Sequence, residues 1–120
     1  MKQLFLLCCF FSSSALCDDT EKISFKKDVM PVISKNCINC HNSEDESPSM
    51  LFMDNYKLLV KGDSKHGPVV LTGKGEESLL IKKMRGITEI GKPMPKGKKS
   101  LPEEVIKKIS MWIDQGAKNN

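Results

Sequence analysis

Cys37-Ile38-Asn39-Cys40-His41 is the motif that constrains this chain more tightly than any other part of its sequence. Two cysteines separated by two residues and followed directly by a histidine form the attachment signature of c-type haem. Each thiol can add to one haem vinyl group, and the adjacent imidazole is then held where it can bind the iron. We therefore expect one haem c, joined by thioether bonds to Cys37 and Cys40, with His41 as the proximal iron ligand.

The same motif also occurs in other kinds of site. A thioredoxin-like redox pair would need a βαβ context, which the sequence does not suggest. A zinc site would need two further cysteine or histidine ligands, whereas His66 is the one such residue outside the motif after position 17. A disulfide between Cys37 and Cys40 would close a very small loop and stabilise little. A non-haem thiol or metal-binding module therefore remains the alternative to haem attachment.

The first seventeen residues have the organisation of a secretory signal peptide. A basic residue at position 2 precedes the short apolar run Leu4–Phe11, and the small residues Ala15 and Cys17 precede the expected cleavage before Asp18. We expect an exported, periplasmic protein, which suits c-type haem attachment outside the cytoplasm. Two alternatives are a membrane anchor and a lipid attached to Cys17. The apolar run is shorter than the roughly 20 residues that span a bilayer, and a leucine is the wrong kind of residue before a lipidated cysteine.

Cleavage would define the composition of the mature chain. Cys8, Cys9 and Cys17 would be lost, so that only the two motif cysteines remain. One of the 19 basic residues and none of the 15 acidic ones would be removed, which leaves a net charge of +3. This mild charge argues against nucleic acid as a partner. We expect no transmembrane segment in the mature chain and one small domain at residues 24–118, after a short leader at residues 18–23.

Helical patterns flank the motif. Ser24 is suited to cap a helix whose apolar residues between positions 25 and 33 share one face. Pro31 either kinks this helix or begins a second one. The motif follows at its carboxyl end, and the polar segment 42–49 predicts a surface loop.

Three further helices are expected. The weakest pattern, at residues 51–60, is followed by Gly62, and a clearer one, at residues 78–85, is followed by Gly86. The clearest of all lies at residues 105–113, where Ser100 and Glu103 have the spacing of a capping box and Gly116 follows the helix. Almost no strand is expected, and the loops are long for a bundle of this size.

The second axial position of the iron has several candidate ligands. Small electron carriers usually use methionine, and Met94 lies in Lys92-Pro93-Met94-Pro95-Lys96, where flanking prolines stiffen the loop. The other methionines after position 17 are Met30, Met50, Met53, Met84 and Met111, of which Met30, Met84 and Met111 fall in predicted helices. We predict Met94 as the distal ligand. His66 is the alternative and would lower the reduction potential.

In this ordered set of motifs the chain resembles the class I mono-haem cytochromes c, and in detail the short planctomycete-type cytochrome c domain. The resemblance covers roughly residues 24–117 and is carried by the Cys37–His41 motif, by Gly73 and Ser78-Leu79-Leu80, by Met94-Pro95 and by the last helix with Trp112-Ile113 and Gly116-Ala117. It implies an all-α cytochrome c-like fold of about four helices, with long loops around one covalently attached haem, and His41 and Met94 as axial ligands. Asn42 and Thr72 depart from the glycine and the proline that the family often has at these positions.

The resulting functional prediction is a monomeric, secreted one-electron carrier between redox partner proteins, and not an enzyme. A lysine-rich region around Met94 is either a solvated loop or a docking surface for an acidic partner; its members are Lys82, Lys83, Lys92, Lys96, Lys98 and Lys99. The alternative is a haem-based gas sensor or weak peroxidase with a labile distal ligand. Trp112 is expected to pack in the core, where the last helix crosses the first, rather than to relay electrons.

Overall fold

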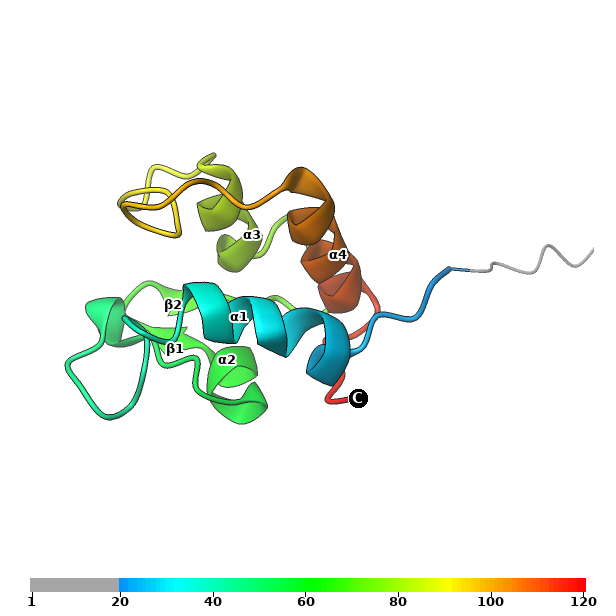
Figure 1. The fold of residues 1–120 in the computed structure, drawn as a ribbon, viewed down its shortest axis with the longest axis horizontal. Coiled ribbons are helices and arrows are strands. Elements are labelled where there is room, and N and C mark those ends of the chain that lie inside the picture. Colours follow the sequence, from blue (N-terminus) through cyan, green and yellow to red (C-terminus); the bar gives the residue numbers. More distant parts are fainter. Residues whose placement is uncertain (1–19) are drawn as a thin grey trace, which may run out of the picture.

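The computed structural model describes residues 20–120, and this part of the chain is mostly helical with very little strand (Figure 1). Its elements are the π-helical turn η1 (Phe25–Val29), α1 (Met30–Asn36), the 3-10 turn η2 (Pro48–Met50), α2 (Tyr56–Lys61), the strands β1 (Asp63–Ser64) and β2 (Gly67–Pro68), α3 (Leu79–Arg85) and α4 (Glu103–Asp114). The prediction of four helices is confirmed. The predicted signal peptide and its cleavage and lipidation sites lie outside the described residues.

The two strands form a short antiparallel hairpin in which Asp63 is opposite Pro68 and Ser64 is opposite Gly67. Within residues 20–120, none of the helices combines the length and the hydrophobicity required to cross a bilayer.

The first helical segment begins at the predicted cap. The Ser24 hydroxyl accepts a hydrogen bond from the Lys27 amide, and Asp28 Oδ2 accepts one from the Ser24 amide. This reciprocal pair satisfies amide groups that would otherwise lack partners at a helix start. The hydrogen bond to Ser24 is the main cause that lowers the pKa of Asp28. Pro31 lies in the first turn of α1, where its missing N–H is not needed. Of the two arrangements predicted for Pro31, a kink or the start of a second helix, the structure has the second, and α1 directly follows η1.

The core forms where α4 packs on η1 and α3 (Figure 1). Trp112 is 1% exposed, and its ring centroid lies 5.4 Å from that of Phe25, which in turn meets Tyr56 edge-on at 5.2 Å. The indole N–H donates to the Lys118 carbonyl at 2.9 Å. A fully buried, hydrogen-bonded indole between two helices is a packing element, as expected for Trp112.

The carboxyl terminus is tied to the beginning of the first helix. Asn120 accepts hydrogen bonds from the amides of Phe25 and Lys26 and donates one to the Ile23 carbonyl. Ile23 itself is only 1% exposed. The packed unit therefore includes residues on both sides of the predicted interval 24–118.

Helix α2 begins later than the predicted residue 51. Asn55 is its N-cap and accepts a hydrogen bond from the Leu58 amide at 3.0 Å, and Gly62 ends it in the left-handed conformation. Residues 51–53 are not helical because their backbone groups bond to His41, as described below. The apolar pattern of this segment thus combines a short extended piece with a short helix.

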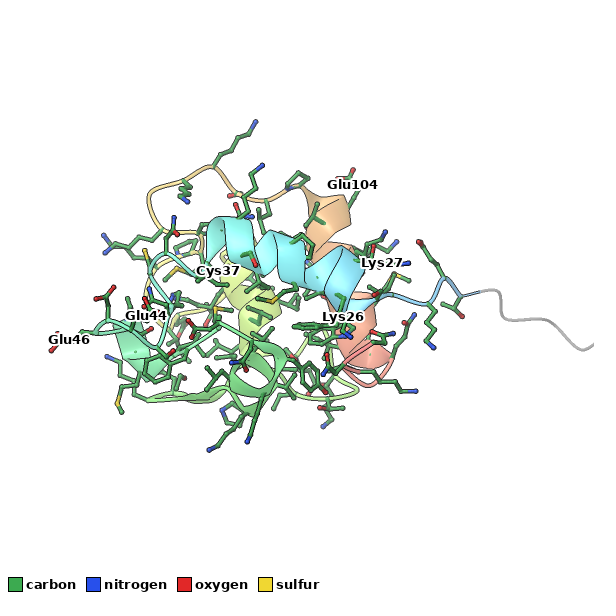
Figure 2. The ribbon with its side chains drawn as sticks, turned by 60° about the horizontal axis from the view of Figure 1, so that its bottom comes forward. Lys26, Lys27, Cys37, Glu44, Glu46 and Glu104 are labelled. Atoms are coloured by element: carbon green, nitrogen blue, oxygen red, sulfur yellow. The ribbon has the colours of Figure 1, made fainter. Side chains whose placement is uncertain are left out.

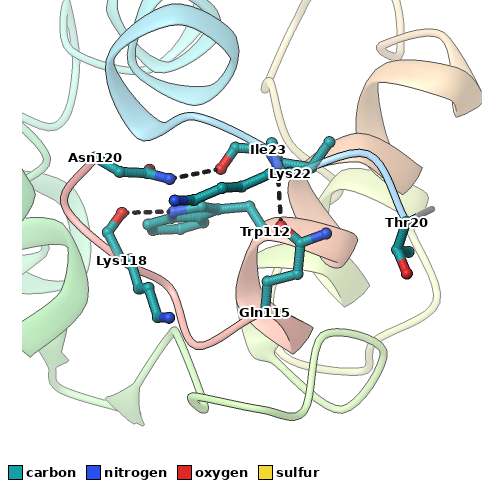
Figure 3. A pocket seen from close by; sticks show the side chains of 7 residues that line it. All are labelled: Thr20, Lys22, Ile23, Trp112, Gln115, Lys118 and Asn120. Carbon is teal, nitrogen blue, oxygen red and sulfur yellow. Dashed lines mark hydrogen bonds between the residues drawn. The ribbon is translucent and has the colours of Figure 1, made fainter. Parts of the chain in front are cut away.

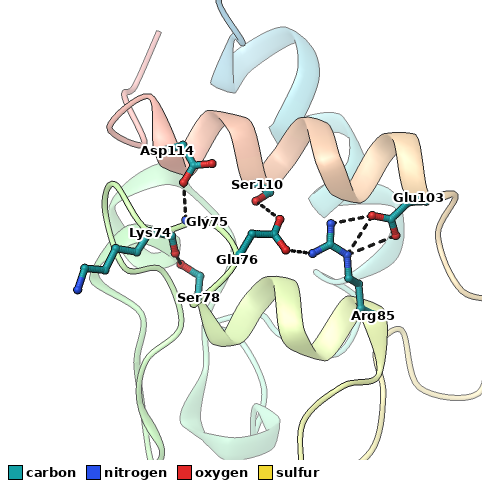
Figure 4. Close-up of polar contacts among 8 residues, drawn as sticks. All are labelled: Lys74, Gly75, Glu76, Ser78, Arg85, Glu103, Ser110 and Asp114. Atoms are coloured by element: carbon teal, nitrogen blue, oxygen red, sulfur yellow. Dashed lines mark hydrogen bonds and ion pairs between the residues drawn. The ribbon is translucent and has the colours of Figure 1, made fainter.

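The predicted capping box at the start of α4 is wrong. The helix begins at Glu103 with Pro102 as its N-cap, and no side chain caps its first amides. Glu103 Oε1 instead accepts from Arg85 Nη2 at 2.7 Å (Figure 4). The ion pair with α3 has replaced the local contact with Ser100. The predicted end is confirmed, because the amides of Gly116 and Ala117 bond back to Ile113 and Trp112.

Arg85 connects α3 to α4 and to the loop before α3 (Figure 4). Besides Glu103, it pairs with Glu76, whose other carboxylate oxygen accepts from the Ser110 hydroxyl at 2.7 Å. The Ser110 hydrogen bond, followed by Arg85, lowers the pKa of Glu76 below its ordinary value of 4.5. Glu76 is thus more stable as a carboxylate in the folded protein than in the unfolded chain.

Replacing Glu76 with Gln is expected to lower the free energy of unfolding at pH 7 by about 0.5–1 kcal/mol, because the Glu76 side chain is 63% exposed and screened by solvent. Since its folded pKa is the lower one, this stabilisation is complete above pH 4.5 and disappears as the pH falls through the folded pKa. Denaturant unfolding should therefore show a larger deficit at pH 7 than at pH 3. Glu77→Gln is the control, because Glu77 is 66% exposed and contacts only Lys74, at 3.9 Å. A deficit of equal size at both pH values would contradict the prediction.

Gly75 is the position least able to accept a side chain. Its amide donates to Asp114 Oδ1 at 2.7 Å, and a Cβ here would overlap the carbonyl and hydroxyl oxygens of Ser110. Because a backbone atom of α4 is involved, Gly75→Ala is expected to destabilise the protein by about 2–3 kcal/mol in denaturant unfolding. Gly67→Ala is the control: a Cβ there meets no atom within 4 Å, so only the left-handed backbone costs about 1 kcal/mol. Equal losses in the two variants would show that the close contact is unimportant.

Candidate functional site

The Cys37–His41 motif forms a turn that continues α1. Cys37 is the C-cap residue of α1, and the amides of Cys40 and His41 donate to its carbonyl at 3.2 and 2.9 Å. Cys37 is half-buried and packs against the core, whereas Cys40 is exposed, and both are free thiols. The helix end and this turn therefore present the three predicted haem-binding side chains from one short, hydrogen-bonded segment.

His41 is oriented by the segment that precedes α2. Its Nδ1 lies 3.2 Å from the Leu51 carbonyl oxygen, and its own carbonyl accepts from the Met53 amide at 2.9 Å. A carbonyl oxygen can only accept, so Nδ1 carries the proton and Nε2 keeps a free lone pair, the arrangement a metal-binding histidine needs. The pKa of His41 is lowered mainly by burial. The hydrogen bond to Leu51 raises this pKa, whereas the positive charge of Lys83 lowers it further. The imidazole is therefore neutral at pH 7.

Two polar residues lie near His41: Asn42, which the sequence singled out as a departure from the family pattern, and Ser47, which it did not. The Ser47 hydroxyl bonds to the Leu51 carbonyl oxygen that also faces His41 Nδ1, and it lies 3.5 Å from that nitrogen. Asn42 organises the following acidic loop, since its Oδ1 accepts from the amides of Glu44 and Asp45. Figure 2 shows Glu44 and Glu46 extending outward from this loop. The bonds to Asn42 Oδ1 form an Asx turn, which fixes the backbone directly after the motif.

Met94 lies on a loop that is fastened to α3. Its amide donates to the Lys83 carbonyl at 2.9 Å, and its side chain is half-buried. The loop leaves α3 at Gly86, the left-handed C-cap, and returns so that Pro93 lies against Gly86. The Met94–Pro95 peptide bond is cis. Met94 is thus presented by a closed loop rather than by a helix.

The Met94 loop and the haem motif lie at the same end of the molecule, away from the carboxyl terminus (Figure 1). The charge of Lys83 helps to lower the pKa of His41, and the charge of Lys98 opposes the rise in the pKa of Cys37. Two segments more than 40 residues apart in the sequence therefore lie at one end of the molecule (Figure 1). Free thiols, an imidazole with Nε2 available and a thioether on a loop at the same end of the molecule are the types of donor that a c-type haem requires.

The other candidate ligands differ in their surroundings. Met53 and Met84 are buried in the core at 2% and 4% exposure, Met30 and Met111 pack against it, and Met50 is 66% exposed. His66 is exposed at the tip of the β1–β2 hairpin, where its amide donates to the Ser64 hydroxyl. Four of the other methionines therefore have a role in core packing. The hydrogen bond within the hairpin explains why His66 lies at its tip.

The non-haem alternatives find less support. Burial raises the pKa of Cys37 to about 11. The positive charge of Lys98 lowers this pKa, and the neighbouring thiol of Cys40 raises it. A redox-active Cys-x-x-Cys pair needs a lowered thiol pKa instead. Among residues 20–120, no group of three or more cysteine, histidine or acidic side chains is arranged to hold a metal ion. The motif therefore lacks the features of a thiol oxidoreductase or of a closed zinc site.

The lysines around Met94 divide into two kinds. Lys92, Lys96, Lys98 and Lys99 are exposed, and within the described part of the chain none of them forms an ion pair. Lys83 is half-buried and bonds to backbone carbonyls of the Met94 loop, so it belongs to the framework of the loop. Ile87 and Ile90, at 65% and 39% exposure, place apolar surface beside the charged residues.

A pocket of about 290 Å³ lies elsewhere, beside the carboxyl-terminal segment (Figure 3). It is lined by Thr20, Lys22, Ile23, Trp112, Gln115, Lys118 and Asn120. None of the predicted haem-binding residues contributes to it, so this pocket has no part in the candidate site.

Comparisons of the chain with protein-family models, with curated proteins and with solved structures found no match.

Proposed function

We propose that this protein is an exported mono-haem c-type cytochrome that carries one electron at a time between redox partner proteins. The observation that carries the proposal is the orientation of His41. The Leu51 carbonyl holds Nδ1 as the protonated nitrogen at 3.2 Å and leaves Nε2 free, directly after a turn that presents two free thiols. A bound haem c would supply an iron atom that cycles between the ferric and ferrous states.

The chain's own residues would set the properties of that iron. Cys37 and Cys40 hold the group covalently, His41 is the proximal ligand, and Met94 is the distal ligand that raises the reduction potential. The Leu51 carbonyl would strengthen His41 as a donor by accepting a hydrogen bond from its Nδ1–H group, and Ser47 competes for the same carbonyl. The closed loop, fixed by the bond from the Met94 amide to the Lys83 carbonyl, would hold the Met94 thioether in place for the iron.

The exposed lysines would serve as the docking region. A ring of unpaired positive charge steers an acidic partner by long-range attraction, and the apolar surface of Ile87 and Ile90 gives a small area that can be desolvated. Small interfaces of this kind form and separate rapidly, as electron transfer requires.

The test is an absorption spectrum of protein matured by the export machinery, in the oxidised and reduced states, with a pyridine haemochrome assay. We expect a c-type haemochrome and a weak band near 700 nm in the oxidised form, the family expectation for methionine bound to iron. Covalent haem without this band would support the assignment as a cytochrome but refute Met94 as the distal ligand. The distal ligand would then be His66, or the site would be open and suited to a gas sensor. Absence of covalent haem would refute the proposal.

A further inference from the structure

We propose that Lys83 is a positioning residue for the distal iron ligand, and that its ammonium group holds the loop Gly86–Met94 in the form that presents the Met94 sulfur. This inference rests on the proposed haem-binding function. It takes Lys83 out of the docking region and gives it a different role, inside the loop.

The contacts of the ammonium group carry the argument. Lys83 Nζ donates to the Ile90 carbonyl oxygen at 2.6 Å and also to that of Lys92. These two acceptors lie at the far side of the loop and just before Pro93. One side chain on α3 therefore joins the helix to the part of the loop that precedes Met94.

The loop is shaped to receive this group. Gly91 lies between the two acceptor residues in the left-handed conformation, and a Cβ there would come within 3.2 Å of Lys83 Nζ. The missing side chain thus leaves the space that the ammonium group uses. Gly86 and Pro93 close the loop at its base, where a Cβ on Gly86 would lie 3.1 Å from Pro93 Cγ.

The need for such a contact follows from the composition of the loop. Residues 86–92 contain two glycines and no proline, so this part of the loop has more backbone freedom than the proline-flanked segment around Met94. Without the ammonium group, the loop beyond Gly86 keeps two backbone hydrogen bonds to α3, one at each end: the Ile87 amide donates to the Lys82 carbonyl, and the Met94 amide donates to the Lys83 carbonyl. Charge-assisted bonds to carbonyl oxygens are stronger than neutral ones, so the Lys83 side chain is the main restraint on the middle of the loop.

The experiment compares the wild-type holoprotein with Lys83→Leu, a substitution that removes the ammonium group without adding a sulfur ligand. Its readouts are the band near 700 nm, the rate at which imidazole binds the ferric iron, and hydrogen exchange of the Met94 amide. We expect a weaker band, faster exchange and imidazole binding accelerated about tenfold, from the loss of charge-assisted hydrogen bonds at a half-buried site. Lys83→Arg keeps a charged donor and should restore much of the wild-type behaviour.

Lys82→Leu is the matched control, because Lys82 precedes Lys83 on α3 and its side chain makes no hydrogen bond or ion pair within residues 20–120. Equal changes in both leucine variants would assign the effect to charge density and overturn the inference, as would wild-type readouts for Lys83→Leu. If Lys83→Leu does not mature, Lys83→Gln provides the same comparison with an uncharged donor. A wild-type protein without the band would refute Met94 ligation itself, which separates the failure of the proposed function from the failure of this inference.

Discussion

Replacing Cys37 and Cys40 together with alanine is expected to abolish covalent haem, from close to one group per chain to a level at background. Both thiols would be gone, and no other cysteine follows position 17. Alanine is preferred to serine because Cys37 packs against the core, where a hydroxyl without a partner would add its own cost. The measurement is haem-stained gel electrophoresis with acid–acetone extraction, which separates covalent from extractable haem.

The same substitution is expected to destabilise the fold. A small domain buries a limited apolar surface of its own, and a covalently held haem would supply a large part of the core. Asn39→Ala is the matched control, because Asn39 is exposed and lies between the two cysteines. Covalent haem in the double variant would refute attachment at this motif. Loss of haem in Asn39→Ala as well would show that the assay reports general damage to the turn.

Replacing Met94 with alanine is expected to remove the band near 700 nm while covalent haem remains. The thioether favours ferrous iron, so the reduction potential should also fall, by about 0.1 V or more within the roughly 0.8 V that axial ligands control. The opened sixth position should bind carbon monoxide in the ferrous state, which the wild-type protein should do poorly. Optical spectroscopy and potentiometry of the purified protein measure all three effects.

Met50→Ala is the control for Met94→Ala, because Met50 ends the short 3-10 turn η2 and is 66% exposed. It should keep the band and the potential of the wild-type protein. His66→Ala tests the rival ligand and should likewise leave the spectrum unchanged. A band that survives in Met94→Ala, or one that disappears in Met50→Ala, would assign the distal position to another residue.

Local patterns were sufficient for much of the fold. The cap at Ser24, the helix ends at Gly62, Gly86 and Gly116, and the apolar face of α4 were all predictable, because each depends on residues a few positions apart. The start of α2 was not, since residues 51–53 follow backbone bonds to His41 rather than their own helical pattern. Ser100 and Glu103 have capping-box spacing, yet Glu103 is drawn to Arg85, 18 positions earlier.

For the candidate site, the chemical types were readable from the chain order: two thiols and an imidazole at fixed spacing, and a methionine between prolines. Because this spacing is set by covalent bonds, no folding is needed to recognise it. The surroundings of these groups depend on the fold, including the carbonyl that orients His41 and the burial that raises the pKa of Cys37. It also distinguished Lys83 from the exposed lysines of the same loop. Hydrogen bonds and burial depend on which distant segments meet, and that is settled by the packing of the whole chain.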